Sequence, residues 1–356
     1  MTLRTFLGKT RRKVLRLLLG ENLYAKTGQI NRHEALIQEQ IDRVNMLENR
    51  INTSSLSIDS ITAQLIEFEN DINNNINWRS DRLFNALVRT TPKASLTSIV
   101  ISIVEHCNLN CWGCDHCAPL AEEYFLGIDE FERDMSRLAE LTKDSEGAIG
   151  TIKLMGGEPL LHPDIQKFTN ISRRFFPGSR IEITTNGILL LKQPDSFWKN
   201  CRENNITIVA TRYPLNIDWD RNKDKAKAEN VLFEFYGNSG NELKTSYHIP
   251  FDINGTQDTV INFMHCFHAN TCRELKHGRL YTCTVVPHAE HFMNVFGIKI
   301  NECNKDSIDI YDVKNMKEIL EFLARPIPFC RYCNVLARTW GHPWQRSKRE
   351  IGEWTI

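Results

Sequence analysis

The 356-residue sequence has no net charge and no apolar run long enough to cross a membrane. A membrane-spanning helix needs roughly 20 apolar residues in a row, and no window of the sequence approaches this. Lys+Arg and Asp+Glu number 44 each, so no overall charge would attract nucleic acid. The apolar run 14–19 is short, contains Arg16 and lacks a cleavage site of small residues, so it does not resemble a secretory signal. These absences predict a cytoplasmic protein that does not bind nucleic acid.

Cysteine, in contrast, is abundant, with 11 residues. Disulfides are uncommon in a reducing cytosol, so metal binding explains the cysteines better. Cys107, Cys111 and Cys114 stand in Cys-Asn-Leu-Asn-Cys-Trp-Gly-Cys, directly after the strand-like run 97–104. Three thiolates on one loop can hold three irons of a [4Fe–4S] cluster and leave the fourth iron open. Cys117 follows after two more residues, so a four-thiolate zinc site also remains possible from the spacing.

A second motif, Gly156-Gly157-Glu158-Pro159, ends the apolar run 152–155. Two glycines allow the backbone to approach a ligand closely, and the carboxylate of Glu158 can accept a hydrogen bond from an ammonium group. The cysteine loop and this motif together resemble the radical S-adenosylmethionine enzymes. One departure is that the residue before the third cysteine, usually aromatic in the family, is Gly113 here, and Trp112 stands one position earlier.

The resemblance implies a partial (β/α)6 barrel whose three cysteines bind a radical-generating [4Fe–4S] cluster. The open iron would bind S-adenosyl-L-methionine, which reductive cleavage converts to a 5′-deoxyadenosyl radical that abstracts hydrogen from substrate. The implied metal ligands are Cys107, Cys111 and Cys114. The implied cofactor-binding residues are Gly156, Gly157 and Glu158.

Strand-like and helix-like runs alternate over residues 95–250, which predicts parallel βαβ units. The predicted strands are Ser98–Val104, Thr151–Met155, Arg180–Thr184, Thr207–Thr211 and Val231–Tyr236, and the predicted helices are Ile128–Leu141, Pro163–Phe175, Asp195–Asn204 and Lys223–Ala228. Chemistry in such barrels gathers at the carboxyl ends of the strands. Thr185, Asn186 and Arg212 follow two of these strands and are predicted to bind the cofactor. The alternatives are an Asn-Gly turn for the first two and, for Arg212, an anionic substrate or a helix cap.

A second group of cysteines lies downstream and contains Cys266, Cys272, Cys283, Cys303, Cys330 and Cys333. The pattern Cys266-x11-Gly278-x4-Cys283, followed by Cys330-x2-Cys333, resembles the twitch and SPASM auxiliary-cluster domains of radical enzymes. Gly278 permits a hairpin turn that brings cysteines on adjacent strands together. The resemblance implies one auxiliary [4Fe–4S] cluster. Which four thiolates bind stays open, because Cys272 can replace a member of the set, and zinc remains an alternative metal.

The ends of the sequence differ from the middle. Isoleucine, valine or leucine recurs every seven residues from Ile30 to Ile72, which predicts a helical, coiled-coil arm. The arm would mediate dimerisation or partner docking, or fold back on the enzyme. Ahead of it, a basic amphipathic segment would either lie on a membrane surface or form a solvated helix. We therefore divide the chain into the arm (1–90), the barrel (95–250), the auxiliary domain (251–340) and an aromatic, basic tail (341–356), which closes the barrel or packs between domains.

The predicted function is a radical S-adenosylmethionine oxidoreductase or epimerase that acts on a sugar or nucleotide-sugar, with flavodoxin or ferredoxin as electron donor. A spare thiol, Cys117, Cys272 or Cys303, would return a hydrogen atom in an epimerase. A histidine flanking the cysteines would act as substrate base; the candidates are His116, His265, His268, His288 and His291. The alternatives are a maturase of ribosomal peptides and a zinc-binding coiled-coil scaffold.

Overall fold

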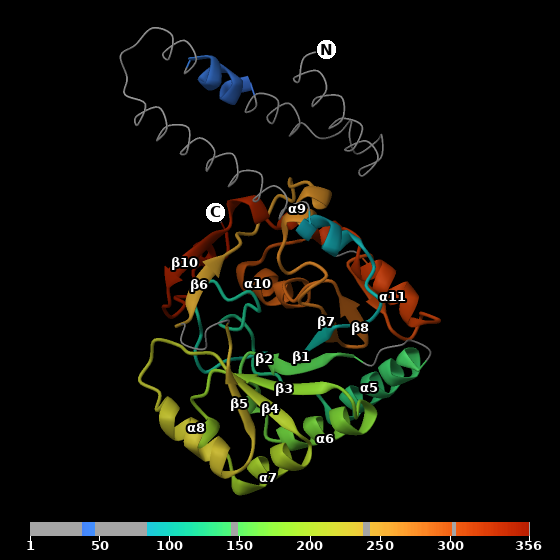
Figure 1. Ribbon diagram of the computed structural model, residues 1–356, viewed down its shortest axis with the longest axis vertical. Coiled ribbons are helices and arrows are strands. Elements are labelled where there is room, and N and C mark those ends of the chain that lie inside the picture. Colours follow the sequence, from blue (N-terminus) through green and yellow to red (C-terminus); the bar gives the residue numbers. More distant parts are fainter. Residues whose placement is uncertain (1–37, 47–83, 144–148, 238–242, 301–303, 356) are drawn as a thin grey trace. The chain divides into compact units, whose positions relative to one another are not determined.

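The computed structural model describes residues 38–46, 84–143, 149–237, 243–300 and 304–355 (Figure 1). The chain divides into two compact units, Met1–Arg79 and Ser80–Ile356. Every predicted site residue falls within the second unit, and Cys303 alone among them lies outside the described residues.

An eight-stranded sheet organises the second unit, in the order β5-β4-β3-β2-β1-β7-β8-β9 (Figure 1). Its strands are β1 Ser98–Val104, β2 Thr151–Gly156, β3 Arg180–Thr185, β4 Ile206–Ala210, β5 Leu232–Phe235, β7 Glu274–Lys276, β8 Arg279–Tyr281 and β9 Ser307–Asp309. Strands β1 to β5 are parallel, and β7 pairs in parallel with β1. Strands β7, β8 and β9 form an antiparallel meander. The predicted α/β class with a mostly parallel sheet is confirmed, but β7 comes from outside the segment 95–250.

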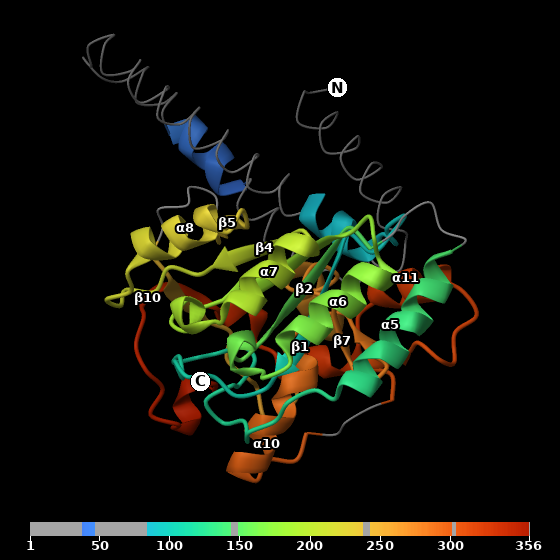
Figure 2. The ribbon, with the colours of Figure 1, turned by 90° about the horizontal axis from the view of Figure 1, so that it is seen from below.

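Four helices cover one face of this sheet: α5 Ile128–Thr142, α6 Ile165–Phe175, α7 Asp195–Glu203 and α8 Trp219–Ala228 (Figures 1 and 2). The strand residues facing them are apolar and fully buried, among them Ile101, Leu154 and Ile183. Each such side chain contributes about 1.5–3 kcal/mol when it leaves water. Helix α8 begins earlier than predicted, because the Asp218 side chain accepts a hydrogen bond from the Arg221 amide and caps it.

The opposite face of the sheet is polar, because alternate strand residues point away from the helices. Lys153 of β2 lies 4.0 Å from Glu182 of β3. The Arg180 guanidinium pairs with both Glu182 and Glu234, each at 2.6 Å. We call this side of the sheet the polar face.

Smaller elements surround the polar face. They are β6 Thr245–His248, α9 Thr259–His265, α10 Ala289–Phe296, α11 Met316–Leu323 and β10 Thr339–Pro343. Strands β6 and β10 form a separate antiparallel pair. A second apolar cluster, which includes Phe251, Phe292 and Phe329, holds this region together.

The hairpin between β7 and β8 has the two-residue turn that Gly278 predicts. Both turn residues adopt positive φ, 50° at His277 and 69° at Gly278. This backbone belongs to the turn type that matches the twist of a two-stranded hairpin. The Gly278 amide donates to Asp134 of α5 at 2.9 Å, which fixes the hairpin against the helical layer.

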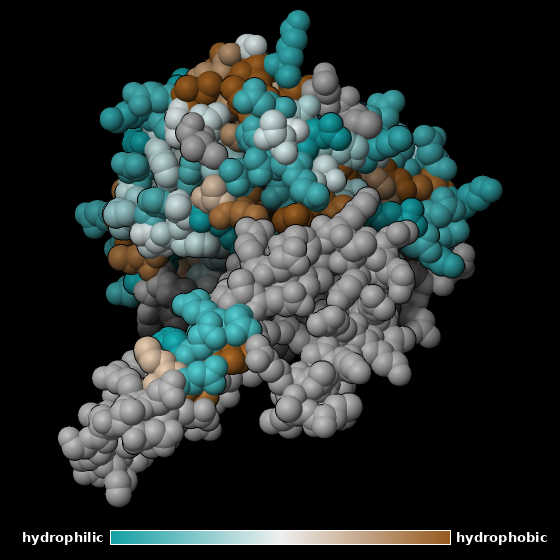
Figure 3. Space-filling model, turned by 90° about the horizontal axis from the view of Figure 1, so that it is seen from above, coloured by the Kyte–Doolittle hydropathy of each residue, from teal (hydrophilic) through white to brown (hydrophobic). Residues whose placement is uncertain are grey.

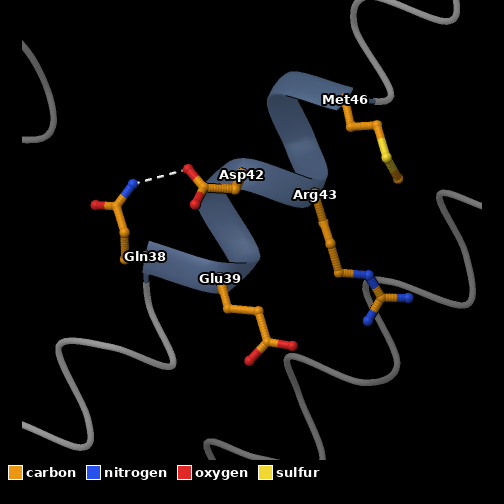
Figure 4. A pocket seen from close by; sticks show the side chains of 5 residues that line it. All are labelled: Gln38, Glu39, Asp42, Arg43 and Met46. Carbon is orange, nitrogen blue, oxygen red and sulfur yellow. Dashed lines mark hydrogen bonds between the residues drawn. The ribbon is translucent and has the colours of Figure 1, made fainter.

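On the face in Figure 3, hydrophilic side chains predominate over the described surface. None of the helices described here is both long enough and apolar enough for a membrane span. In the first unit, the described residues 38–46 form a helix, in which the Gln38 amide donates to Asp42 at 2.8 Å (Figure 4). The rest of the predicted coiled-coil arm up to residue 83 and the basic N-terminal segment lie outside the described residues.

Candidate active site

The three-cysteine loop follows β1, and its thiols lie close enough to interact. The thiol of Cys111 interacts electrostatically with those of Cys107 and Cys114, and Tyr213 interacts with all three. Burial raises the pKa of each thiol, that of Cys107 to about 12. A buried thiol stays protonated near neutral pH until a metal replaces the proton. These donors therefore fit a cluster held by three thiolates.

Cys117 occupies a different environment. Its side chain is fully buried in the second apolar cluster, with Phe251 and Phe292. Its amide donates to the Cys114 carbonyl at 2.9 Å, at a φ of 48°. Cys117 thus closes the turn of the cysteine loop.

Gly156 and Gly157 pack the end of β2 against the start of the cysteine loop. The amides of Gly157 and Glu158 donate to the carbonyls of Val104 and His106, at 2.7 and 3.1 Å. A Cβ atom on Gly157 would lie 1.9 Å from the His106 oxygen, and Gly156 has a φ of 127°. The close approach that these glycines allow is to the backbone of the cysteine loop, whereas the sequence suggested an approach to a ligand.

The Glu158 side chain joins the ends of β2 and β3. Its carboxylate accepts hydrogen bonds from the Thr185 hydroxyl at 2.6 Å, the Asn186 amide at 2.9 Å and the Leu160 amide at 3.1 Å. Burial raises the pKa of Glu158 to about 7, although these hydrogen bonds oppose the rise. The Asn186 side chain donates to Asn108 of the cysteine loop at 2.7 Å. The structure therefore brings Glu158, Thr185 and Asn186 together beside Cys107.

Arg212 lies after β4, with its guanidinium 4.9 Å from the centre of the Phe235 ring. It is thus at the carboxyl end of the sheet, like Thr185 and Asn186. Binding of the cofactor by these residues remains a prediction.

Four downstream cysteines form a second group, which we call the auxiliary cysteines: Cys266, Cys283, Cys330 and Cys333. Cys266 ends α9, Cys283 follows β8, and the other two lie in and after the 3-10 helix η4 Pro328–Tyr332. The thiol of Cys333 interacts with those of the other three. The Asn262 side chain donates to the carbonyls of Cys330 and Cys333. Four thiols that interact with one another fit a metal site with four thiolate ligands.

Cys272 lies beside β7, and its thiol interacts with Asp115, Lys153 and Cys266. Burial raises its pKa to about 11. The interactions with Asp115 and Lys153 set Cys272 apart from the auxiliary cysteines.

Asp115, Tyr247 and His268 connect the two groups of cysteines. The Tyr247 hydroxyl donates to Asp115 at 2.6 Å and lies 3.1 Å from His268 Nε2. Burial would raise the pKa of Asp115, but His116, His268 and Tyr247 outweigh it and hold the pKa below its usual range. Since Asp115 follows Cys114 and His268 closely follows Cys266, a polar bridge spans the region between the thiols.

A buried ionic network, which the sequence analysis largely missed, borders this region. His288 Nδ1 lies 2.9 Å from Glu105, and its Nε2 lies 2.9 Å from Glu274. Glu105 also pairs with Lys276 at 3.1 Å and His291 at 2.8 Å. The network thus pairs buried carboxylates with cationic side chains. Sequence reasoning singled out the two histidines, but their acidic partners are distant in the chain.

The C-terminal segment, residues 339–354, lies along the cysteine loop. The Trp344 indole donates to Cys111 Sγ at 3.1 Å, and the Trp354 indole donates to the Cys114 carbonyl at 2.9 Å. The Trp112 amide donates to the Gln345 carbonyl at 2.9 Å. The sequence suggested that this aromatic tail covers the barrel or packs between domains; it contacts the predicted cluster ligands directly.

Comparison with known proteins identifies the class. Residues 101–218 match the family model of the Radical SAM superfamily. The chain therefore carries a radical S-adenosylmethionine domain, as its two motifs predicted. Such a domain implies a [4Fe–4S] cluster and S-adenosylmethionine as cofactors, and the thiols of the cysteine loop fit the cluster.

The curated relatives include GTP 3′,8-cyclases. The enzyme of Nautilia profundicola is 35% identical over 92 residues, which are 26% of this chain and 28% of the relative. That of Staphylococcus epidermidis is 27% identical over 167 residues, 44% of this chain and 47% of the relative. The chain thus matches less than half the length of either relative.

Two solved structures show a distant similarity to this chain. BtrN in complex with AdoMet and 2-DOIA is 17% identical, with 68% of this chain and 94% of BtrN covered at a TM-score of 0.43. Streptococcus suis SuiB bound to the precursor peptide SuiA is 14% identical, with 86% and 84% covered at a TM-score of 0.35. Neither likeness is close enough to bear on the substrate.

Proposed function

We propose that this radical S-adenosylmethionine enzyme abstracts a hydrogen atom from a sugar or nucleotide-sugar, leading to oxidation or epimerisation. Cys107, Cys111 and Cys114 would hold the radical-generating [4Fe–4S] cluster. When bound, that cluster and S-adenosylmethionine supply the 5′-deoxyadenosyl radical. Glu158, Thr185 and Asn186 would organise the cofactor side of the site.

The polar face of the sheet is the observation that carries this proposal. Lys153 and Glu182 offer charged groups there, and the thiol of Cys272 interacts with both Lys153 and Asp115 of the cysteine loop. A site lined by charged and hydrogen-bonding groups favours a substrate whose hydroxyl groups can hydrogen-bond with them. This composition favours a polyhydroxylated molecule over an apolar one.

The second part of the proposal is an auxiliary [4Fe–4S] cluster on Cys266, Cys283, Cys330 and Cys333. In an oxidation, this cluster would accept an electron from the substrate radical. In an epimerisation, the thiol of Cys272 would return a hydrogen atom, and the electron donor, flavodoxin or ferredoxin, would then reduce the thiyl radical, with uptake of a proton from solvent. The raised pKa of Cys272, about 11, keeps the S–H group protonated at neutral pH, as a hydrogen donor requires.

Deuterium tracing with the anaerobically reconstituted full chain tests the proposal. Sugars and nucleotide-sugars deuterated at each hydroxyl-bearing carbon are incubated with S-adenosylmethionine and a reductant. Transfer of deuterium into 5′-deoxyadenosine from one of them is the expected result. Transfer from a deuterated peptide or from GTP instead would contradict the proposed substrate class.

Incorporation of solvent deuterium into product distinguishes the two fates of the substrate radical. In deuterium oxide, epimerisation incorporates solvent deuterium into product, and Cys272→Ala abolishes the incorporation. Oxidation gives a product that lacks two hydrogens, with or without Cys272. A colourless zinc protein that does not cleave S-adenosylmethionine would exclude both branches.

A further inference from the structure

The Trp344 indole is directed at a sulfur atom of the cysteine loop. Its Nε1 lies 3.1 Å from Cys111 Sγ, within the range of an N–H···S hydrogen bond. The Tyr213 hydroxyl hydrogen-bonds the same sulfur. The two rings pack edge to face, with centroids 5.9 Å apart. Cys111 therefore has two side-chain donors from parts of the chain far from the loop.

The C-terminal segment holds this indole in place through contacts on both sides. Before Trp344, β10 pairs with β6. After it, the Ser347 amide donates to the Asn110 carbonyl at 2.8 Å, and the Lys348 amide donates to Glu353 at 2.6 Å. Trp354 ends the segment and is 3% exposed. The donor geometry at Cys111 is thus part of the folded structure.

Hydrogen bonds to cluster sulfurs are among the features that set the reduction potential of an iron–sulfur cluster. A donor stabilises the negative charge on a thiolate ligand, and reduction adds negative charge to the cluster. The donor therefore favours the reduced state and raises the potential. Radical chemistry begins with reduction of this cluster, so the donor affects the first step.

We propose that Trp344 is a positioning residue whose indole N–H raises the reduction potential of the cluster held by the cysteine loop. The C-terminal segment thereby makes the cluster easier for an electron donor to reduce. This inference rests on the assignment of Cys111 as a cluster ligand.

The reduction potential of the reconstituted full chain, measured by redox titration with electron paramagnetic resonance, tests the inference. The signal that S-adenosylmethionine perturbs identifies the radical cluster. In Trp344→Phe, the potential is expected to become more negative. At a fixed potential near the midpoint, the ratio of reduced to oxidised cluster should fall roughly fivefold, the worth of one hydrogen bond.

Two further variants make the result specific. Replacing Trp344 by 3-benzothienylalanine keeps the ring shape but removes the N–H group, so it should reproduce the shift even if the phenylalanine variant fails to take up iron. Trp198→Phe is the matched control, because that indole is buried in the main core, and the reduction potential of this variant should equal that of the wild type.

Wild-type potentials in both Trp344 variants, or an equal shift in Trp198→Phe, would overturn the inference. The absence of any S-adenosylmethionine-sensitive signal from the wild type would instead contradict the cluster assignment in the proposed function. The two failures are therefore distinguishable.

Discussion

The two groups of cysteines are built in opposite ways. The cysteine loop places Cys107, Cys111 and Cys114 on one short stretch after β1, where spacing alone brings the thiols together. The auxiliary cysteines come from α9, the end of β8 and η4. The first group is a local motif, whereas the second exists only after the chain has folded.

Their surroundings differ as well. The cysteine loop receives polar contacts from remote residues, such as Trp344 on Cys111 and Asn186 on Asn108. Cys283, Cys330 and Cys333 instead belong to, or pack on, the second apolar cluster. The polar contacts of the cysteine loop fit the proposed radical-generating cluster, and the apolar packing of the auxiliary cysteines fits the proposed electron-accepting cluster.

The largest expected effect concerns the cysteine loop. Cys111→Ala should abolish formation of 5′-deoxyadenosine, because the remaining thiolates cannot hold the radical cluster. Chromatography of the reaction products measures this. Cys201→Ala is the control, since Cys201 is buried in the main core, away from both groups. Full turnover by the Cys111 variant would show that the cysteine loop does not hold the radical cluster.

Comparing Cys283→Ala with Cys272→Ala tests the assignment of the auxiliary cysteines. The wild type should contain about eight irons if both clusters are [4Fe–4S]. Cys283→Ala should lose about half of them, whereas Cys272→Ala should keep them all. Iron and sulfide analysis after anaerobic reconstitution provides the measurement. Iron loss in the Cys272 variant instead would make Cys272 a ligand of the auxiliary site.

Gly157→Ala tests whether the cysteine loop depends on its contact with β2. The added Cβ atom would lie 1.9 Å from the His106 oxygen, so the backbone must move, at a cost of about 2–4 kcal/mol. Chemical denaturation of the apoprotein measures the change in unfolding free energy. Gly178→Ala is the matched control, because a Cβ there meets nothing within 4 Å. Equal stability of the two variants would show that the loop adjusts freely.

The smallest effect is the pH dependence contributed by His288. Burial lowers its pKa, but Glu274 and Glu105 outweigh burial and raise it to about 9. The folded protein holds this proton more tightly than the unfolded chain. The contribution of His288 to the free energy of unfolding is therefore complete below the ordinary histidine pKa of about 6.5. It is lost as the pH rises towards 9.

Thermal unfolding between pH 6.5 and 9 should therefore show stability falling by about 1–3 kcal/mol. His288→Gln should be less stable at pH 6.5 and should show a flatter profile over the same window. A profile as steep as that of the wild type would assign the pH dependence to other groups.

The sequence predicted the sheet well where strands are apolar and alternate with amphipathic helices, as from β1 to α8. It did not predict β7, because that strand is short and contains Glu274 and Lys276. The contacts of Trp344 with Cys111 and of His288 with Glu105 join distant segments. No periodicity or spacing encodes such pairs, since they depend on how the elements pack.

The backbone contacts of Gly157 and Glu158 with the cysteine loop bear on the order of assembly. Two amides of the β2 end donate to carbonyls flanking Glu105, so strand pairing shapes the loop before any iron arrives. The apoprotein would then already hold the cysteine loop in its metal-binding conformation. Apoprotein from cells grown under iron limitation is expected to keep the circular dichroism spectrum of the native protein. It should also accept iron and sulfide without refolding.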